Sequence, residues 1–129
     1  MKIEHLALQM KDPVAAASWY VKHLGFCVWR KQDTPPFAHF LADSSGATVL
    51  EIYCNPKVRA PDYARMDPLL LHLAFAVGDV ARERTRLLAA GARKEGEVAV
   101  TETGDTIAVV RDPWGLAIQL VKRSRPLNS

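Results

Sequence analysis

Residues 70–77 read Leu-Leu-His-Leu-Ala-Phe-Ala-Val, an apolar run in which His72 is the one polar side chain. A short apolar run of this kind is typical of a strand. An imidazole in such a strand needs a partner, because burying an unpaired polar group is costly. The same phrase stands earlier, at residues 3–9, as Ile-Glu-His-Leu-Ala-Leu-Gln with His5 in the matching place. We interpret the chain as a duplicated module with one histidine in each copy.

The duplication extends past these two phrases. His5 and His72 are 67 positions apart, and so are Asp12 and Asp79, each of which precedes a helical pattern as an N-cap. The glycines expected to end the two helices also correspond, and they are Gly25 and Gly91. Ordered self-similarity of this kind is evidence for a repeat architecture and is considered before other fold assignments.

Each copy is predicted to run strand, helix, strand, strand, strand within a single domain, residues 1–129. Module one (1–54) is expected to contain strands at 3–10, 26–32, 37–42 and 47–54 and a helix at 13–24. Module two (70–123) is expected to contain strands at 70–77, 98–102, 106–111 and 116–122 and a helix at 80–90. The linker is residues 55–69, with a helical turn near 63–66, and the tail is residues 124–129.

Two more polar residues interrupt apolar strands. Glu51 follows His5 by 46 positions, and Gln119 follows His72 by 47. Alternation along a strand places Glu51 on the same face as Val49 and Tyr53. A carboxylate among apolar neighbours requires a compensating partner, which makes these two residues candidates for function together with the histidines.

Composition and charge narrow the classes of function. The formal net charge of +3 comes without a stripe of basic and aromatic residues, so nucleic acid is not an expected partner. No apolar run reaches the length of a membrane span, and the start of the chain lacks a signal-peptide pattern. Cys27 and Cys54 lack metal-ligand spacing and are expected to be reduced, buried side chains. These features predict a cytoplasmic protein.

A known family pattern is carried by five motifs: Ile3-Glu-His5-Leu-Ala, Trp19-Tyr20 with Leu24-Gly25-Phe26, Leu50-Glu51-Ile52, Leu71-His72-Leu-Ala-Phe and Asp112-Pro-Trp-Gly115-Leu-Ala-Ile-Gln119-Leu. Together they resemble the vicinal oxygen chelate superfamily, which includes glyoxalase I, methylmalonyl-CoA epimerase, extradiol dioxygenases and bleomycin-resistance proteins. The resemblance implies an α+β fold. Two βαβββ modules would form a cupped, eight-stranded mixed sheet or half-barrel, in a homodimer.

The resemblance also implies a metal site made of His5, Glu51, His72 and Gln119. Two imidazoles, a carboxylate and an amide oxygen suit a divalent ion such as Zn, Ni, Co, Mn or Fe. Coordination positions would remain open for water or a small-molecule substrate. The sequence leaves open whether Gln119 is a ligand or a hydrogen-bonding neighbour, and whether one chain or two supply the site.

Glyoxalase I-like members usually carry a Glu at the position of Gln119, and an amide cannot accept the proton that this Glu takes. Epimerase-like members resemble the order His, Gln, His, Glu, whereas this chain has His, Glu, His, Gln. Our hypothesis is that Glu51 serves as both ligand and base, with Gln119 as its counterpart. The activity would be isomerase, epimerase or lyase chemistry on a small oxygenated, anionic substrate through a metal-chelated enediolate.

Two alternatives come from the same family resemblance. A non-catalytic protein of the bleomycin-resistance type would sequester a drug or metabolite, with walls from Tyr53, Trp29, Phe37 and Trp114. A ring-cleaving dioxygenase ranks lower, because those relatives resemble a last-strand Glu and this chain has Glu51 in the first module. His39 is a further candidate for lining the cup, without support from the repeat.

Overall fold

The computed structural model describes residues 1–127 and divides into two compact units. The first unit ends at Pro61 and the second begins at Asp62. This boundary lies inside the predicted linker, so each unit contains one predicted module. Among the described residues no helix has the length and apolar character needed to cross a membrane.

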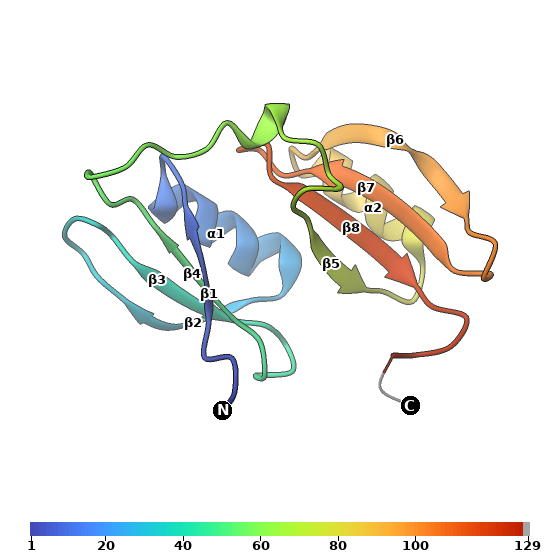
Figure 1. Cartoon of the computed structure of the whole chain (residues 1–129), viewed down its shortest axis with the longest axis horizontal. Helices are drawn as coiled ribbons and strands as arrows, with labels where there is room; N and C mark the ends of the chain where they lie inside the picture. Colours follow the sequence, from blue (N-terminus) through green and yellow to red (C-terminus); the bar gives the residue numbers. More distant parts are fainter. Residues whose placement is uncertain (128–129) are drawn as a thin grey trace. The chain divides into compact units, whose positions relative to one another are not determined.

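The first unit is a four-stranded sheet with one helix (Figure 1). Its order along the sheet is β1-β4-β3-β2, with β1 parallel to β4 and the other pairs antiparallel. The elements are β1 (Leu6–Gln9), α1 (Pro13–Leu24), β2 (Cys27–Lys31), β3 (His39–Ala42) and β4 (Val49–Tyr53).

The second unit repeats this topology (Figure 1). Its order is β5-β8-β7-β6, with β5 parallel to β8 and the other pairs antiparallel. The elements are the 3-10 turn η1 (Tyr63–Arg65), β5 (Leu73–Ala76), α2 (Val80–Ala89), β6 (Arg93–Val100), β7 (Thr106–Arg111) and β8 (Ala117–Lys122). Two mixed sheets, each with one helix, confirm the predicted α+β fold with eight strands.

The predicted helix starts are confirmed. Oδ1 of Asp12 accepts a hydrogen bond from the backbone N of Ala15 at 3.0 Å, and Oδ1 of Asp79 accepts one from Arg82 N at 3.0 Å. Each bond satisfies a backbone donor that the first helical turn leaves without a partner. Gly25 has φ +75°, the left-handed conformation that commonly ends a helix.

The strand register repeats between the units. Ala7 on β1 pairs with Glu51 on β4, and Ala74 on β5 pairs with Gln119 on β8. His5 lies two residues before Ala7, and His72 lies two residues before Ala74. Each histidine therefore has the same position relative to the Glu51 or Gln119 of its own unit. The duplication inferred from spacing is thus also a duplication of hydrogen-bond register.

The two strands that follow the histidines each begin three residues later than predicted, and the strand predicted at 98–102 is misplaced. β1 and β5 start at Leu6 and Leu73, so His5 and His72 each stand immediately before a strand. The strand predicted at 98–102 is β6, which runs from 93 to 100. Its charged start lacks an apolar period because β6 is an edge strand whose side chains are largely exposed.

Candidate functional site

The first sheet has one face covered by α1 and one open face. Leu50 and Ile52 point toward the helix and are 3% and 0% exposed. The intervening residues of β4 are half-buried and point the other way. The open face is defined by Ala7 of β1, Phe40 of β3, and Val49, Glu51 and Tyr53 of β4.

His5 and Glu51 come together on this open face. Nε2 of His5 lies 3.8 Å from Oε2 of Glu51, and their side chains are 30% and 18% exposed. Two ligands that each stand about 2.1 Å from an ion are about 3–4 Å apart, depending on the angle between them. The spacing of this pair therefore suits two adjacent ligands of one ion.

The His5 ring is held by its neighbours. The ring of Phe40 contacts it edge-on, with ring centroids 5.4 Å apart and an interplanar angle of 88°. Nδ1 of His5 is buried and has no hydrogen-bond partner among the described residues, although Oε1 of Glu4 lies 3.2 Å away without the alignment of a hydrogen bond. The ring thus presents Nε2 toward Glu51 and leaves its other nitrogen available to the Glu4 carboxylate.

His72 of the second unit is oriented by a backbone carbonyl. Its Nδ1 lies 2.7 Å from the carbonyl oxygen of Pro68. A carbonyl oxygen can only accept, so the neutral ring carries its hydrogen on Nδ1 and keeps the lone pair on Nε2. This is the arrangement by which a metal-ligating histidine usually fixes its tautomer.

Gln119 lies half-buried in the middle of β8, between Ala74 of β5 and Val109 of β7. Ile118 and Leu120, its neighbours along the strand, are 0% and 2% exposed. Gln119 therefore lies on the open face of the second sheet, as Glu51 does in the first.

Each unit holds two of the four predicted residues, His5 with Glu51 in the first and His72 with Gln119 in the second. No group of three or more His, Cys, Asp or Glu side chains arranged to hold an ion is found in the part of the chain that the structure describes. The donor types nevertheless fit a divalent metal, since the first unit offers an imidazole beside a carboxylate and the second an imidazole with a free Nε2.

His39 does not line the open face. It pairs with Ile52 across β3 and β4, so both side chains lie on the side that packs toward α1. His39 is 7% exposed and its Nδ1 lies 2.6 Å from the carbonyl oxygen of Phe37. It is a buried, hydrogen-bonded core histidine, and the prediction that it could line the cup is wrong.

The aromatic residues predicted to line the cup and the two cysteines differ in location and in exposure. Tyr53 lies on the open face and is half-buried, whereas Trp29 on edge strand β2 is 60% exposed. Phe37 and Trp114 are half-buried and lie outside the strands. Cys27, expected to be buried, is exposed because β2 lies at the sheet edge, and Cys54 is half-buried.

The structure also shows a polar residue that sequence reasoning missed. Arg111, at the end of β7, is 8% exposed. Its guanidinium donates to the carbonyl oxygens of Tyr63 (2.9 Å), Gly115 (3.1 Å) and Met66 (3.0 Å), and to Oε2 of Glu95 at 2.8 Å. The available signal was a charged residue at the end of an apolar strand, a weaker signal than the polar residue inside an apolar strand that singled out Gln119.

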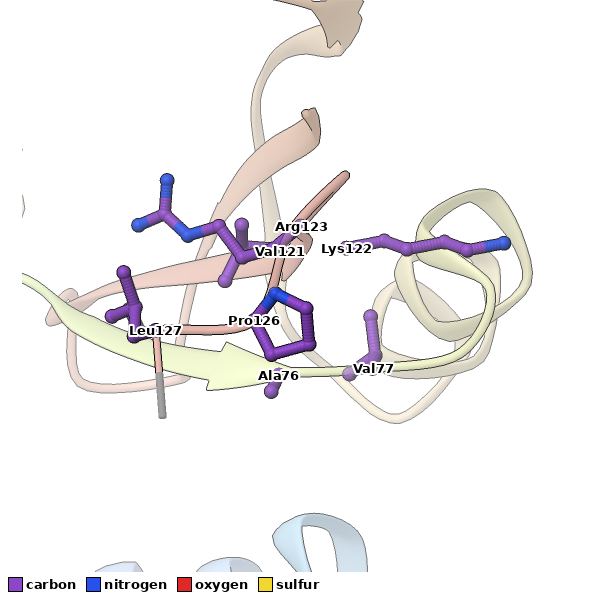
Figure 2. Close-up of a pocket in the computed structure, with 8 residues that line it drawn as sticks. Ala76, Val77, Val121, Lys122, Arg123, Pro126 and Leu127 are labelled. Carbon is purple, nitrogen blue, oxygen red and sulfur yellow. The ribbon is translucent and has the colours of Figure 1, made fainter. Parts of the chain in front are cut away.

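A pocket of about 460 Å³ lies in the second unit (Figure 2). Its apolar lining includes Ala74 and Ala76 of β5 and Val121 of β8. Because Ala74 pairs with Gln119 and Val121 follows it by two positions, the pocket adjoins Gln119 along the open face. The remaining lining residues come from the end of β5, the end of β8 and the tail, and are Val77, Lys122, Arg123, Pro126 and Leu127.

The tail beside this pocket is anchored by Asp105, which is 7% exposed. Its carboxylate accepts hydrogen bonds from the backbone N of Ser124 at 2.8 Å and from the Arg123 guanidinium at 2.8 Å. The Ser124 backbone bond, followed by the bond from Arg123, lowers the pKa of the Asp105 carboxyl below its usual value. Asp105 is therefore a structural carboxylate that stays ionised at neutral pH.

Comparison with known proteins gives a family and a set of similar structures. The model of the Glyoxalase/Bleomycin resistance protein/Dioxygenase superfamily matches residues 2–120. The crystal structure of SMU.1112c is 33% identical, with 95% of this chain and 98% of that chain covered and a TM-score of 0.72. The glyoxalase family protein from Enterococcus faecalis is 30% identical, with coverages of 94% and 97% and a TM-score of 0.69.

A glyoxalase I mutant from Zea mays is also similar in structure. It is 23% identical and has a TM-score of 0.75, with 96% of this chain and 46% of that chain covered. At that identity the similarity shows a shared fold. The search of curated proteins gives no match.

Proposed function

From the fact that this chain belongs to the Glyoxalase/Bleomycin resistance protein/Dioxygenase superfamily, we propose its activity. The protein is a metal-dependent isomerase, epimerase or lyase of glyoxalase I-like type. The observation that carries the proposal is the convergence of His5 and Glu51, 3.8 Å apart on the open face of the first sheet. Family membership alone would not select an activity, because one fold hosts many chemistries.

The proposed ligands are His5 and Glu51 from the first unit and His72 and Gln119 from the second. They would bind one divalent ion, either within one chain or across a homodimer. Support comes from the repeated register, which pairs Ala7 with Glu51 and Ala74 with Gln119. When bound, the ion would supply positive charge for an anionic oxygen of the substrate.

Glu51 is the proposed base. A general base must reach the hydrogen that it removes, and Glu51 is half-buried on the open face and partly accessible. Gln119 cannot accept a proton, so its proposed role is to bind the ion or to hydrogen-bond the substrate. The proposed step is removal of a proton from carbon next to a carbonyl, with return of that proton at the same or a neighbouring carbon.

The proposed substrate is a small, oxygenated, anionic molecule. The pocket beside Gln119 has an apolar floor of Ala74, Ala76 and Val121, which suits a short carbon skeleton. Lys122 and Arg123 at its edge add positive charge, although Arg123 also pairs with Asp105. We further propose that the protein acts in the cytoplasm, where both of its free cysteines would stay reduced.

Elemental analysis of the purified protein tests the proposal. The wild-type chain is expected to hold about one divalent ion per chain, and His5→Ala and His72→Ala are expected to lose it. His39→Ala is the matched control, since His39 is also a histidine of the first sheet but lies on the helix-covered face. Metal content that is unchanged in both His5→Ala and His72→Ala would contradict the proposal.

A metal-free binding protein is the second candidate. It is favoured by the apolar pocket of the second unit and by the Phe40 and Tyr53 rings on the first sheet's open face. The test is to grow and dialyse the wild-type protein with added Zn, Ni, Co, Mn or Fe and then to measure ligand binding by calorimetry. Protein that holds no metal but binds a small aromatic or anionic ligand would support this candidate over the enzyme.

A further inference from the structure

Arg111 is buried beside the segment that leads to His72. It is 8% exposed, and its side chain bonds four acceptors. Two of them, the carbonyl oxygens of Tyr63 and Met66, belong to the segment just before β5. A buried guanidinium with several fixed acceptors is rigid, because rotating it would leave charged donors unpaired.

The segment between Met66 and His72 is short and braced. The Asp67 side chain accepts a hydrogen bond from Leu69 N at 2.8 Å, and the Asp67 carbonyl oxygen accepts one from Leu70 N at 2.9 Å. These two bonds close a turn around Pro68, whose own φ is restricted by its ring. The Pro68 carbonyl then accepts from Nδ1 of His72 at 2.7 Å.

From this chain of contacts we propose that Arg111 is the positioning residue for His72. Arg111 holds the backbone of Met66, and the turn at Asp67 then determines where the Pro68 carbonyl lies. This carbonyl fixes the Nδ1–H tautomer of His72 and the direction of its Nε2. The part of the inference that concerns metal affinity rests on the proposed function, in which His72 is a ligand. The part that concerns the tautomer does not.

Glu95 completes the arrangement. Its Oε2 lies 2.8 Å from Nε of Arg111, and its side chain is 37% exposed, so it compensates the buried charge from the solvent side. A lysine at position 111 would keep the charge but could not reproduce a planar fork that reaches Glu95 and three carbonyls. Arg111→Lys therefore separates the geometry of the side chain from its charge.

The test combines an NMR measurement on metal-free protein with a metal titration. Long-range ¹H–¹⁵N spectra at about pH 8.5, where a free imidazole is neutral, report which ring nitrogen of His72 carries hydrogen. Wild-type protein is expected to show Nδ1–H. Arg111→Lys and Arg111→Met are expected to shift His72 toward the Nε2–H form and to weaken the Zn²⁺ Kd about tenfold or more.

Arg84→Met is the matched control. Arg84 also bonds a backbone carbonyl and a glutamate, Gly96 and Glu97, but does not touch the segment before His72. It is expected to leave the tautomer and the Kd within about twofold of wild type. Asp67→Ala removes the side-chain bond to Leu69 N and so loosens the turn without removing the buried charge. It is expected to reproduce the Arg111 effect and decides the matter if the Arg111 variants do not fold.

The outcomes separate the two proposals. Wild-type protein that binds no metal overturns the proposed function, while a tautomer that changes in the variants still supports Arg111 as the positioning residue. If folded Arg111→Met, or Asp67→Ala where the Arg111 variants do not fold, keeps the wild-type Nδ1–H signature of His72, this inference is wrong whatever the metal result.

Discussion

Nε2 of His5 and Oε2 of Glu51 lie 3.8 Å apart, although 45 residues separate them along the chain. The parallel pairing of β1 with β4 produces this contact, because it sets Ala7 opposite Glu51 and so brings the residue two positions earlier beside the carboxylate. A one-residue slip in this register would turn Glu51 toward the helix-covered face.

The first prediction concerns Glu51 and its neighbour Glu4. Glu51→Gln is expected to lower turnover by about 10²–10⁴-fold, the usual contribution of a general base. Glu4→Gln is the control, because the Glu4 carboxylate is also close to His5 but its side chain is 81% exposed. The measurement is proton exchange at the carbon next to the carbonyl, across a panel of hemithioacetal and acyl-thioester substrates. Full activity of Glu51→Gln on a substrate that wild type turns over would remove Glu51 from the mechanism.

A second prediction tests the close approach at Gly115. A Cβ at this position would stand 2.6 Å from the backbone N of Ala64, and Gly115 has φ +95°. Backbone strain at this φ is expected to reduce the free energy of unfolding of Gly115→Ala by about 1–3 kcal/mol, and the clash with Ala64 is expected to reduce it further. Gly78→Ala, where no heavy atom lies within 4 Å of the added Cβ, is expected to change it by less than about 1 kcal/mol. Urea unfolding of both variants measures the difference, and equal effects would contradict the contact.

The third prediction is a pH dependence that arises from Asp105. Because the hydrogen bonds from Ser124 and Arg123 lower its pKa in the folded protein, Asp105 contributes stability above the unfolded-state pKa of about 3.9. That contribution is lost as the pH falls through the lower, folded-state pKa. Asp105→Asn is therefore expected to be less stable than wild type at pH 7, with a difference that shrinks in acid. A stability difference that is the same at pH 7 and pH 3 would show that the charge of Asp105 is not the cause.

The fourth prediction tests whether the two modules use their helix caps equivalently. Asp12→Ala and Asp79→Ala are each expected to cost about 1 kcal/mol, because each removes the acceptor for a backbone N–H in the first helical turn. Asp12→Asn and Asp79→Asn should retain most of the stability, since Asn caps a helix about as well as Asp. Thermal unfolding of the four variants measures this, and asparagine variants as unstable as the alanine variants would indicate that charge rather than the cap bond matters.

Much of the architecture follows from local chemistry in the sequence. Both N-caps, the glycine that ends α1 and the helical turn at 63–65 are where the residues predict them, because caps and turns are decided by interactions over three or four neighbouring positions. β6 was misplaced because the solvent-facing charges of an edge strand carry no apolar period. His39 shows the same limit, since its side of the sheet is decided by its pairing with Ile52.

The sequence by itself determined the repeat and the four polar residues that stand out in or beside apolar strands, because spacing and alternation are read directly along the chain. The α+β class followed from the family resemblance that the motifs carry. Only the tertiary structure brought His5 to Glu51, turned His39 toward the helix and placed Arg111 against the segment before His72. These relationships join residues more than ten positions apart, and they depend on strand register and backbone carbonyl positions that no local pattern specifies.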